Sequence, residues 1–322
     1  RFVPDIDMFI KMHIFKEAVV SNRIEGTRTN IEEALNNEND INPEKRDDWK
    51  EVNNYVSAMN SSIEDLKNLP ISSRLLKDTH KVLLSNVRGE HKNPGEFRTS
   101  QNWIGGASIA DAVFVPPVHT KLPQLITDLD LFLNNDELKI PYLIKIAIAH
   151  YQFETIHPFL DGNGRIGRLL ITLYLVSAGI LEKPLLYLSE FFEKNKGLYY
   201  DNLTFVRTKN DITQWIRFFL TGIIQTAENS VETLRKIMDL KSRIEKEEIV
   251  SLGKRSQNGM NLFHKLFKNP VVSVKTVQSL TGLSQKAAND LVHIFVEKKI
   301  LVETTGYQRN RIFVFRDYIR LF

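Results

Sequence analysis

Residues 157–168 read HPFLDGNGRIGR and bring an imidazole, a carboxylate, an asparagine between two glycines and two guanidiniums into one short stretch. On both sides, over 140–156 and 164–179, apolar residues recur at spacings of three and four, which predicts two helices. Because Pro158 cannot continue the first helix, we expect that helix to end near Ile156 and the second to begin near Asn163. The stretch is therefore predicted to be a loop between two helices.

The loop and the start of the second helix are suited to bind an anion. The backbone N–H groups of DGNG can converge, and the first turn of a helix has unpaired N–H donors. Arg165 and Arg168 are three residues apart and share one face of that helix, where its dipole is already positive. We infer that a polyphosphate balances this charge and accepts bidentate hydrogen bonds from the guanidiniums.

Two side chains beside this loop are candidates for chemistry. A phosphate would repel Asp161 unless a cation lay between them, and Mg²⁺ typically binds one or two protein carboxylates together with phosphate oxygens. His157, with an ordinary pKa of about 6.5, can accept a proton near neutral pH and activate a hydroxyl. For DGNG alone the alternative is a calcium loop or an ordinary turn, and for His157 alone a structural role. Residues 162–167, GNGRIG, have the G-x-G-x-x-G spacing of a Rossmann site, but they follow a predicted helix rather than a strand, and the Walker pattern does not occur in this stretch.

The stretch resembles the signature of the Fic-domain family, HPFx(D/E)GNGRxxR, at every defined position. The resemblance implies transfer of AMP from ATP to a Ser, Thr or Tyr hydroxyl of a target protein, with release of pyrophosphate. A few relatives use UTP, GTP or CDP-choline instead. The implied roles are general base for His157, Mg²⁺ ligand for Asp161, loop anchor for Phe159, anion hole for Gly162, Asn163 and Gly164, and phosphate binding for Arg165 and Arg168.

A second motif, SNRIEG at 21–26, resembles the inhibitory [S/T]xxxE[G/N] motif of many Fic proteins. The resemblance assigns Ser21, Glu25 and Gly26 to this motif and implies that Glu25 pairs with Arg168 and occupies the space of the γ-phosphate. The alternative is an ordinary helix end, with Gly26 as the stop and Glu25 exposed. Because some relatives use this glutamate to direct water, removal of AMP is a further expected activity, as is modification of the chain itself.

The segment 95–117 resembles the part of the family that contains a flap. We expect a short hairpin that turns at Gly105 and Gly106 and ends at Pro116 and Pro117. An open hairpin edge can pair with an extended target segment by strand addition. A solvent-facing hairpin without a ligand is the alternative, and Phe114 stands where relatives often have Tyr.

A further segment, 191–203, resembles a region that lines the nucleotide pocket in relatives. Its candidates for contacts with the nucleoside are Asn195, Tyr199 and Tyr200. Aromatic residues at helical spacing also pack in cores, which is the alternative for both tyrosines.

The basic character of the chain is concentrated in its last part. The net charge is only +4, but residues 255–322 hold eleven Lys or Arg against four Asp or Glu. Helices are predicted over 261–269, 274–280 and 285–299, followed by strands over 300–305 and 311–316, the order of a winged helix-turn-helix. Packing against a partner protein is the alternative to binding DNA. The candidates for contacts with DNA are Lys286, His293, Lys298, Lys299, Arg309 and Arg311.

Together these patterns predict a mainly α protein, with a Fic-type helical core, a small hairpin flap and a C-terminal winged helix-turn-helix. The predicted segments are an N-terminal helical region (1–70), a catalytic core (71–225), a connecting helix (226–254) with a boundary near Gly253, and the winged module (255–322). The rival function is a DNA-binding regulator whose Fic-like part senses nucleotide. A homodimer is expected by family analogy.

The predicted location is the cytoplasm. The chain has no cysteine, which excludes disulfides and thiolate metal sites and fits a reducing compartment. No apolar run reaches the roughly 18 residues that span a bilayer, so no association with a membrane is expected.

Overall fold

The computed structural model describes residues 7–307 and 309–322, which form two compact units. We call Glu17–Thr29 with Asn42–Ala227 the motif unit, because it contains residues 157–168. Arg1–Lys16, Asn30–Ile41 and Glu228–Phe322 make up the C-terminal unit. Among the residues that the structure describes, no helix combines the length and the apolar character that a bilayer crossing requires.

The units divide the chain inside two helices, α1 (Asp7–Ile24) and α10 (Thr213–Arg243). The predicted connecting helix is therefore continuous with the helix before it, because this stretch contains no proline and Gly222 is its only glycine. A π-helical turn (Ile244–Ile249) and a 3₁₀ segment (Val250–Arg255) follow, and Gly253 lies in the latter with a φ of +57°. The two compact units therefore do not coincide with the four segments predicted from the sequence. The boundaries of those segments stay predictions.

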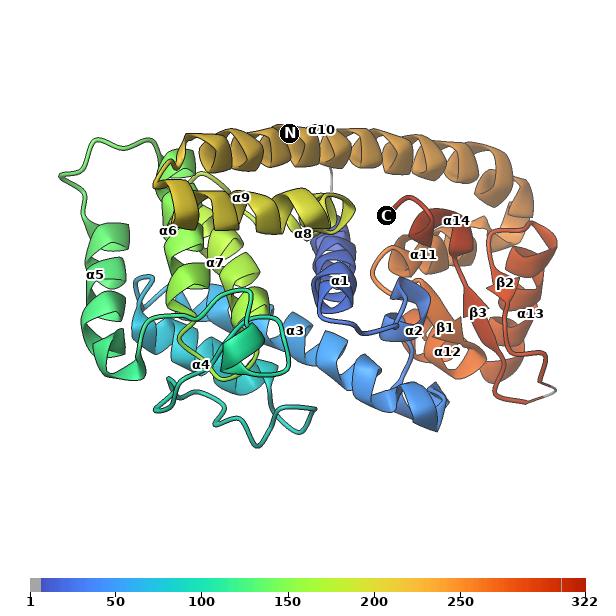
Figure 1. The fold of residues 1–322 in the computed structure, drawn as a ribbon. Helices are drawn as coiled ribbons and strands as arrows, with labels where there is room; N and C mark the ends of the chain where they lie inside the picture. Colours follow the sequence, from blue (N-terminus) through green and yellow to red (C-terminus); the bar gives the residue numbers. More distant parts are fainter. Residues whose placement is uncertain (1–6, 308) are drawn as a thin grey trace. The chain divides into compact units, whose positions relative to one another are not determined.

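The motif unit is built from helices around α7 (Asn163–Ser177), whose residues from Arg165 to Leu175 are all buried. A helix that is buried all round is typical of the centre of a core. The helix α6 (Tyr142–Ile156) packs against α7, as Figure 1 shows. The other helices of this unit are α3 (Arg46–Asp65), α4 (Ser73–Leu83), α5 (Leu122–Asn134), α8 (Ser189–Lys194) and α9 (Lys196–Lys209), with a 3₁₀ turn, η2 (Pro43–Lys45), before α3 and another, η4 (His119–Lys121), before α5.

The predicted hairpin at the flap is wrong in its detail. Among the described residues 101–117 the only β pairing is a single antiparallel bridge between Ile104 and Phe114, and a 3₁₀ turn, η3 (Ile109–Asp111), lies between them. The carboxylate of Asp111 accepts hydrogen bonds from the N–H groups of Ala107 (2.8 Å) and Ser108 (2.7 Å). These local bonds give the backbone an alternative to a ladder of cross-strand bonds, so the segment is a compact loop.

The C-terminal unit contains helices α11 (Ser256–Leu266), α12 (Val274–Thr281) and α13 (Gln285–Glu297), with a short α14 (Arg316–Ile319) and, from the N-terminal part of the chain, α2 (Ile31–Leu35) and the 3₁₀ turn η1 (Glu38–Asp40). Its sheet has three antiparallel strands in the order β1 (Val271–Ser273), β3 (Ile312–Val314), β2 (Val302–Glu303). The three predicted helices and the two later strands are confirmed, whereas β1 and α14 were not predicted. The assignment to the winged-helix class stays a prediction.

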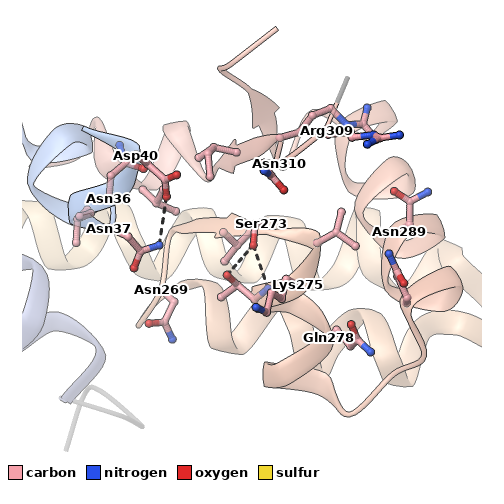
Figure 2. Close-up of a pocket in the computed structure, with 18 of the residues that line it drawn as sticks. Asn36, Asn37, Asp40, Asn269, Ser273, Lys275, Gln278, Asn289, Arg309 and Asn310 are labelled. Carbon is pink, nitrogen blue, oxygen red and sulfur yellow. Dashed lines mark hydrogen bonds between the residues drawn. The ribbon is translucent and has the colours of Figure 1, made fainter. Parts of the chain in front are cut away.

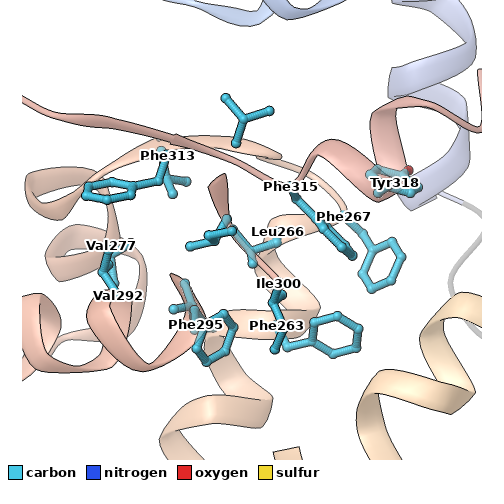
Figure 3. Close-up of a cluster of buried hydrophobic side chains, with 14 of the residues drawn as sticks. Phe263, Leu266, Phe267, Val277, Val292, Phe295, Ile300, Phe313, Phe315 and Tyr318 are labelled. Atoms are coloured by element: carbon cyan, nitrogen blue, oxygen red, sulfur yellow. The ribbon is translucent and has the colours of Figure 1, made fainter. Parts of the chain in front are cut away.

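Aromatic side chains fill the core of this unit (Figure 3). Phe263 and Phe267 of the α11 region and Phe315 after β3 are at most 1% exposed. The ring of Phe267 lies edge-on to Phe315, with 5.6 Å between the centroids, and to Tyr318, with 4.9 Å. Such edge-to-face pairs add to the free energy gained from burial, so the module has a core of its own.

Candidate active site

The loop 157–162 is held in a fixed shape between α6 and α7. As predicted, α6 ends at Ile156 and α7 begins at Asn163. His157 and Gly162 both adopt the left-handed conformation, with φ of +50° and +76°. The buried side chain of Asn163 accepts a hydrogen bond from the N–H of Phe159 and donates one to its carbonyl, both at 2.8 Å. The side chain of Asn163 therefore fixes the shape of the loop.

Three side chains outside the motif also hold this loop, and sequence reasoning missed them. The Nδ1 atom of His80 accepts a hydrogen bond from the N–H of Gly95 (2.9 Å), so its Nε2 atom is the one that donates to the carbonyl of Asp161 (3.0 Å). The buried Arg98 donates to the carbonyl of His157 (3.0 Å), and Asn102 donates to that of Phe159 (3.0 Å). No sequence pattern marks a side chain that binds main-chain carbonyls.

The ring of His157 is neutral near pH 7. Burial is the main cause that lowers its pKa to about 4, and the nearby charges of Arg207 and Arg98 contribute to this shift. Its Nδ1 atom is buried and has no hydrogen-bond partner among the described residues. A neutral imidazole can accept a proton, as a general base must.

A cavity of about 300 Å³ opens beside this histidine. Of the residues predicted for the site, those that line it are Glu25, His157, Asp161, Gly162, Asn163, Gly164, Arg168, Tyr199 and Tyr200. Trp103, Ile104 and Gly105 of the flap loop line it as well. Arg165, Asn195, Ser21 and Gly26 are not among its lining residues. The cavity therefore contains both an anion-binding helix start and a candidate base.

Arg168 is one of the cations that line this cavity, and it is joined to the predicted inhibitory motif. Its Nη2 atom donates to Oε1 of Glu25 at 2.6 Å and to the carbonyl of Ser21 at 3.0 Å, and its Nε atom donates to Oγ of Ser21 at 2.8 Å. Partial burial opposes ionisation of Glu25, but the charge of Arg168 and its hydrogen bond outweigh that effect and lower the pKa of Glu25. Glu25 is therefore an anion placed where we expect phosphate.

The surroundings of this ion pair depend on two glycines. A Cβ atom on Gly164 would lie 2.6 Å from Oε1 of Glu25, so only glycine allows the carboxylate to reach the start of α7. Gly26 has a φ of +104° and follows the end of α1, as expected for a helix stop. The two interpretations of SNRIEG are thus compatible, because the helix end is also where Glu25 contacts Arg168.

Arg165 has a different environment from Arg168. Its side chain is 4% exposed, and its Nη1 atom lies 3.3 Å from Oδ1 of Asn22 and 3.4 Å from Oε2 of Glu51. Its Nη2 atom lies 3.5 Å from Oδ1 of Asp161. Arg165 therefore contacts Asp161, α1 and α3 at the same time.

Asp161 is the candidate magnesium ligand, and its side chain is 42% exposed. Within residues 7–307 and 309–322, no group of three or more His, Asp or Glu could hold a metal ion by itself. A single accessible carboxylate still fits Mg²⁺, which commonly takes one or two protein carboxylates and completes its shell with phosphate oxygens and water. The role of Asp161 as a magnesium ligand therefore stays a prediction, which its accessible carboxylate fits.

The three candidates for the nucleoside pocket differ in position. Tyr199 is buried, and its hydroxyl is 3.0 Å from Nε2 of His150. Tyr200 is 42% exposed and lines the cavity next to it. The side chain of Asn195 donates to the carbonyl of Phe191 at 2.9 Å. Tyr200 is thus the most accessible of the three, and Asn195 stabilises the junction of α8 and α9.

Two more ionisable residues, Glu154 and Arg207, line the cavity and were not predicted. Glu154 is buried, its Oε1 atom has no hydrogen-bond partner among the described residues, and burial raises its pKa to about 7. It lies one turn before His157 on α6, a spacing that could have suggested it. The guanidinium of Arg207 stacks on Phe114 of the flap loop, 3.8 Å from the ring centroid.

Comparisons with known proteins agree with this geometry. Residues 1–64 match the model of the Fic/DOC family N-terminal region, and residues 70–175 match that of the Fic/DOC family. The chain is 34% identical over 153 residues to the protein adenylyltransferase Fic of Aedes aegypti and 33% identical to that of Culex quinquefasciatus. These matches cover 47% of this chain but only 28% and 27% of the two relatives.

Solved structures show the same fold. A Fic family protein from Desulfovibrio desulfuricans G20 superposes with a TM-score of 0.59 at 20% identity, over 94% of this chain and 86% of that one. Fic-1 (residues 134–508) from C. elegans superposes with a TM-score of 0.51 at 22% identity, over 69% of this chain and 63% of that one. From the two matching family models, its relatives and its fold, we conclude that this chain belongs to the Fic/DOC family.

Proposed function

We propose that this chain is a protein adenylyltransferase that transfers AMP from ATP to a Ser, Thr or Tyr hydroxyl and that Glu25 inhibits it. The observation that supports this most directly is the 2.6 Å hydrogen bond between Arg168 and Glu25 in a cavity that His157 also lines. A buried guanidinium beside a helix start requires an anion, and here a carboxylate of the chain itself meets that need. The printed name of the mosquito relatives, protein adenylyltransferase, agrees with the proposal.

In the proposed reaction the neutral imidazole of His157 accepts the proton of the target hydroxyl. The hydroxyl oxygen then forms a bond with the α-phosphorus of ATP, and the bond from that phosphorus to the bridging oxygen breaks, so that pyrophosphate leaves. Backbone N–H groups of Gly162 to Gly164 stabilise the charge on the phosphate oxygens. Magnesium held by Asp161 would neutralise further phosphate charge. Arg168 binds the γ-phosphate once Glu25 has moved away.

The flap loop is the proposed docking site of the target protein. Trp103, Ile104 and Gly105 line the cavity, and the exposed Val113 and Val115 follow on the opposite arm. An extended target segment that pairs with this arm would bring its hydroxyl towards His157 with little dependence on sequence. Pairing needs only main-chain groups, so we expect several targets, and the chain itself is one of them.

A transfer assay tests the function. We expect the Glu25→Gly variant to move label from the α-phosphate of ATP onto proteins of a host lysate and to move none from the γ-phosphate. The double variant with His157→Ala should lose transfer, whereas His91→Ala, which removes an exposed histidine, should not. Label that persists without His157 would contradict the assigned base. Nucleotide binding without any transfer would favour the rival function, a nucleotide-sensing regulator.

A further inference from the structure

A polar groove in the C-terminal unit is not explained by nucleotidyl transfer. It is a cavity of about 940 Å³ lined by β1, the N-terminal parts of α12 and α13, residues 309–312 and, at one end, residues of the N-terminal segment 35–40 (Figure 2). Its lining includes the cations Lys275, Arg309 and Arg311, and Asp40 is the one acidic residue among the described residues that line it. In Figure 2 Asp40 lies at the end of the groove away from Asn289 of α13. Most of the groove is therefore positively charged.

The face of α13 that borders this groove presents carboxamides. Gln285, the first residue of α13, and Asn289 are four residues apart and share one face. Neither side chain has a hydrogen-bond partner among the residues that the structure describes. His293 continues the same row, and its Nε2 atom lies 3.5 Å from Nη2 of Arg311. The groove thus has a row of amide groups beside a cationic edge.

The elements around the groove have the order of a helix-turn-helix with a hairpin. Gly282, with a φ of +73°, ends α12, and Ser284 caps α13 through a hydrogen bond to the N–H of Ala287. In modules of this kind the N-terminal residues of the second helix contact base edges in the major groove. Asn and Gln pair with adenine N6 and N7 through two hydrogen bonds, and Lys and Arg bind phosphates. Gln285 and Asn289 lie in the first two turns of α13, the part of the second helix that contacts bases in such modules.

We propose that this groove binds double-stranded DNA, with Gln285 and Asn289 reading adenine edges and Lys275, Arg309 and Arg311 contacting phosphates. Single-stranded nucleic acid is bound largely through stacking on aromatic side chains, and none of the described residues that line the groove is aromatic. The cores of protein interfaces are enriched in aromatic residues and depleted in charged ones. The described lining of this groove has the opposite composition, with charged residues and no aromatic one.

The structure also changes the set of contact residues expected from sequence. Lys298 forms an ion pair with Glu248, with 3.0 Å between Nζ and Oε2, and it does not line the groove. Lys275 and Gln285 were not predicted, although both line the groove and are exposed. The proposal is independent of the transferase function, since no residue that lines the groove belongs to the motif unit.

Binding of the full-length chain to short fluorescent duplexes of random sequence tests the phosphate contacts. We expect affinity to fall steeply with salt, and Lys275→Ala and Arg309→Ala each to reduce the slope of log K against log salt by about 0.9. Lys254→Ala, which removes an exposed lysine of the same unit outside the groove, is the matched control. Absence of duplex binding at low salt, tighter binding of single strands, or an equal effect of Lys254→Ala would overturn the proposal.

Selection from a pool of random duplexes tests the reading of bases. The unaltered chain should enrich a sequence with adenine at two fixed positions. Gln285→Ala and Asn289→Ala should each reduce discrimination at one position by about 5- to 150-fold, with an unchanged salt slope and an unchanged circular dichroism spectrum. If both variants select the same sequence as the unaltered chain, or if the unaltered chain selects none, these residues do not read bases and the proposal is wrong.

Discussion

Removal of the Glu25 carboxylate should strengthen productive binding of ATP. A hydrogen bond between charged groups contributes about 1.5–3 kcal/mol, and we take about 1–2 kcal/mol for Arg168 and Glu25 because the Glu25 side chain is 37% exposed and solvent screens it. If the pair must open before the γ-phosphate can bind, the apparent affinity is reduced by the fraction of open molecules. One to two kcal/mol corresponds to about 5- to 30-fold.

Titration calorimetry with ATP and Mg²⁺ would measure this gain in Glu25→Gln and Glu25→Ala. The same titrations with AMP, which has no γ-phosphate, should show a much smaller difference between the variants and the unaltered chain. Glu64→Ala is a suitable control, because it also removes one negative charge, from an exposed pair with Lys67. Equal ATP affinities for the unaltered chain and Glu25→Gln would refute the proposed competition, as would an equal gain in Glu64→Ala.

Three further predictions concern stability. Asn163→Ala should lower the free energy of unfolding by about 1–3 kcal/mol in urea, because the buried N–H of Phe159 loses its partner while the carbonyl of Phe159 keeps only the bond from Asn102; a change below about 0.5 kcal/mol would contradict this role. Glu154 keeps its proton in the folded state up to about pH 7, so stability should decline by up to about 3 kcal/mol from its unfolded pKa near 4.5 to that pH. Urea titrations at pH 5 and pH 8 should show that the free energy of unfolding falls less with pH in Glu154→Gln than in the unaltered chain. An identical pH dependence in the two proteins would count against this role of Glu154. Phe263→Ala should destabilise the C-terminal unit by about 3–5 kcal/mol in calorimetry, and an unchanged melting profile would show that its burial contributes little.

The ends of the helices around the motif were predictable, because proline and glycine restrict or free the backbone locally. Ile156 and Asn163 follow from Pro158 and from the spacing of apolar residues alone. The contact between Glu25 and Arg168 was expected only through resemblance to a family, since the two residues are 143 positions apart. No local pattern could have indicated that they meet.

Other parts of the site could not be predicted, and the reasons are physical. His80, Arg98 and Asn102 act through hydrogen bonds to main-chain carbonyls. Every residue has such a carbonyl, so these bonds produce no recognisable pattern in the sequence. The flap loop was predicted as a hairpin because its glycines and prolines suit one, but the carboxylate of Asp111 binds the backbone instead. Strand β1 is three residues long, too short for any alternation of apolar and polar residues to indicate it.

The way in which Arg168 is held affects how fast the site can exchange one anion for another. Two of its three hydrogen bonds go to Ser21, and only the third goes to Glu25. When the carboxylate turns away, the guanidinium therefore keeps its orientation, and an arriving phosphate meets a donor that needs no reorganisation. The motion required is rotation of one partly exposed side chain, which occurs in picoseconds to nanoseconds. Exchange at Arg168 should then be limited by the arrival of nucleotide rather than by unwinding of α1.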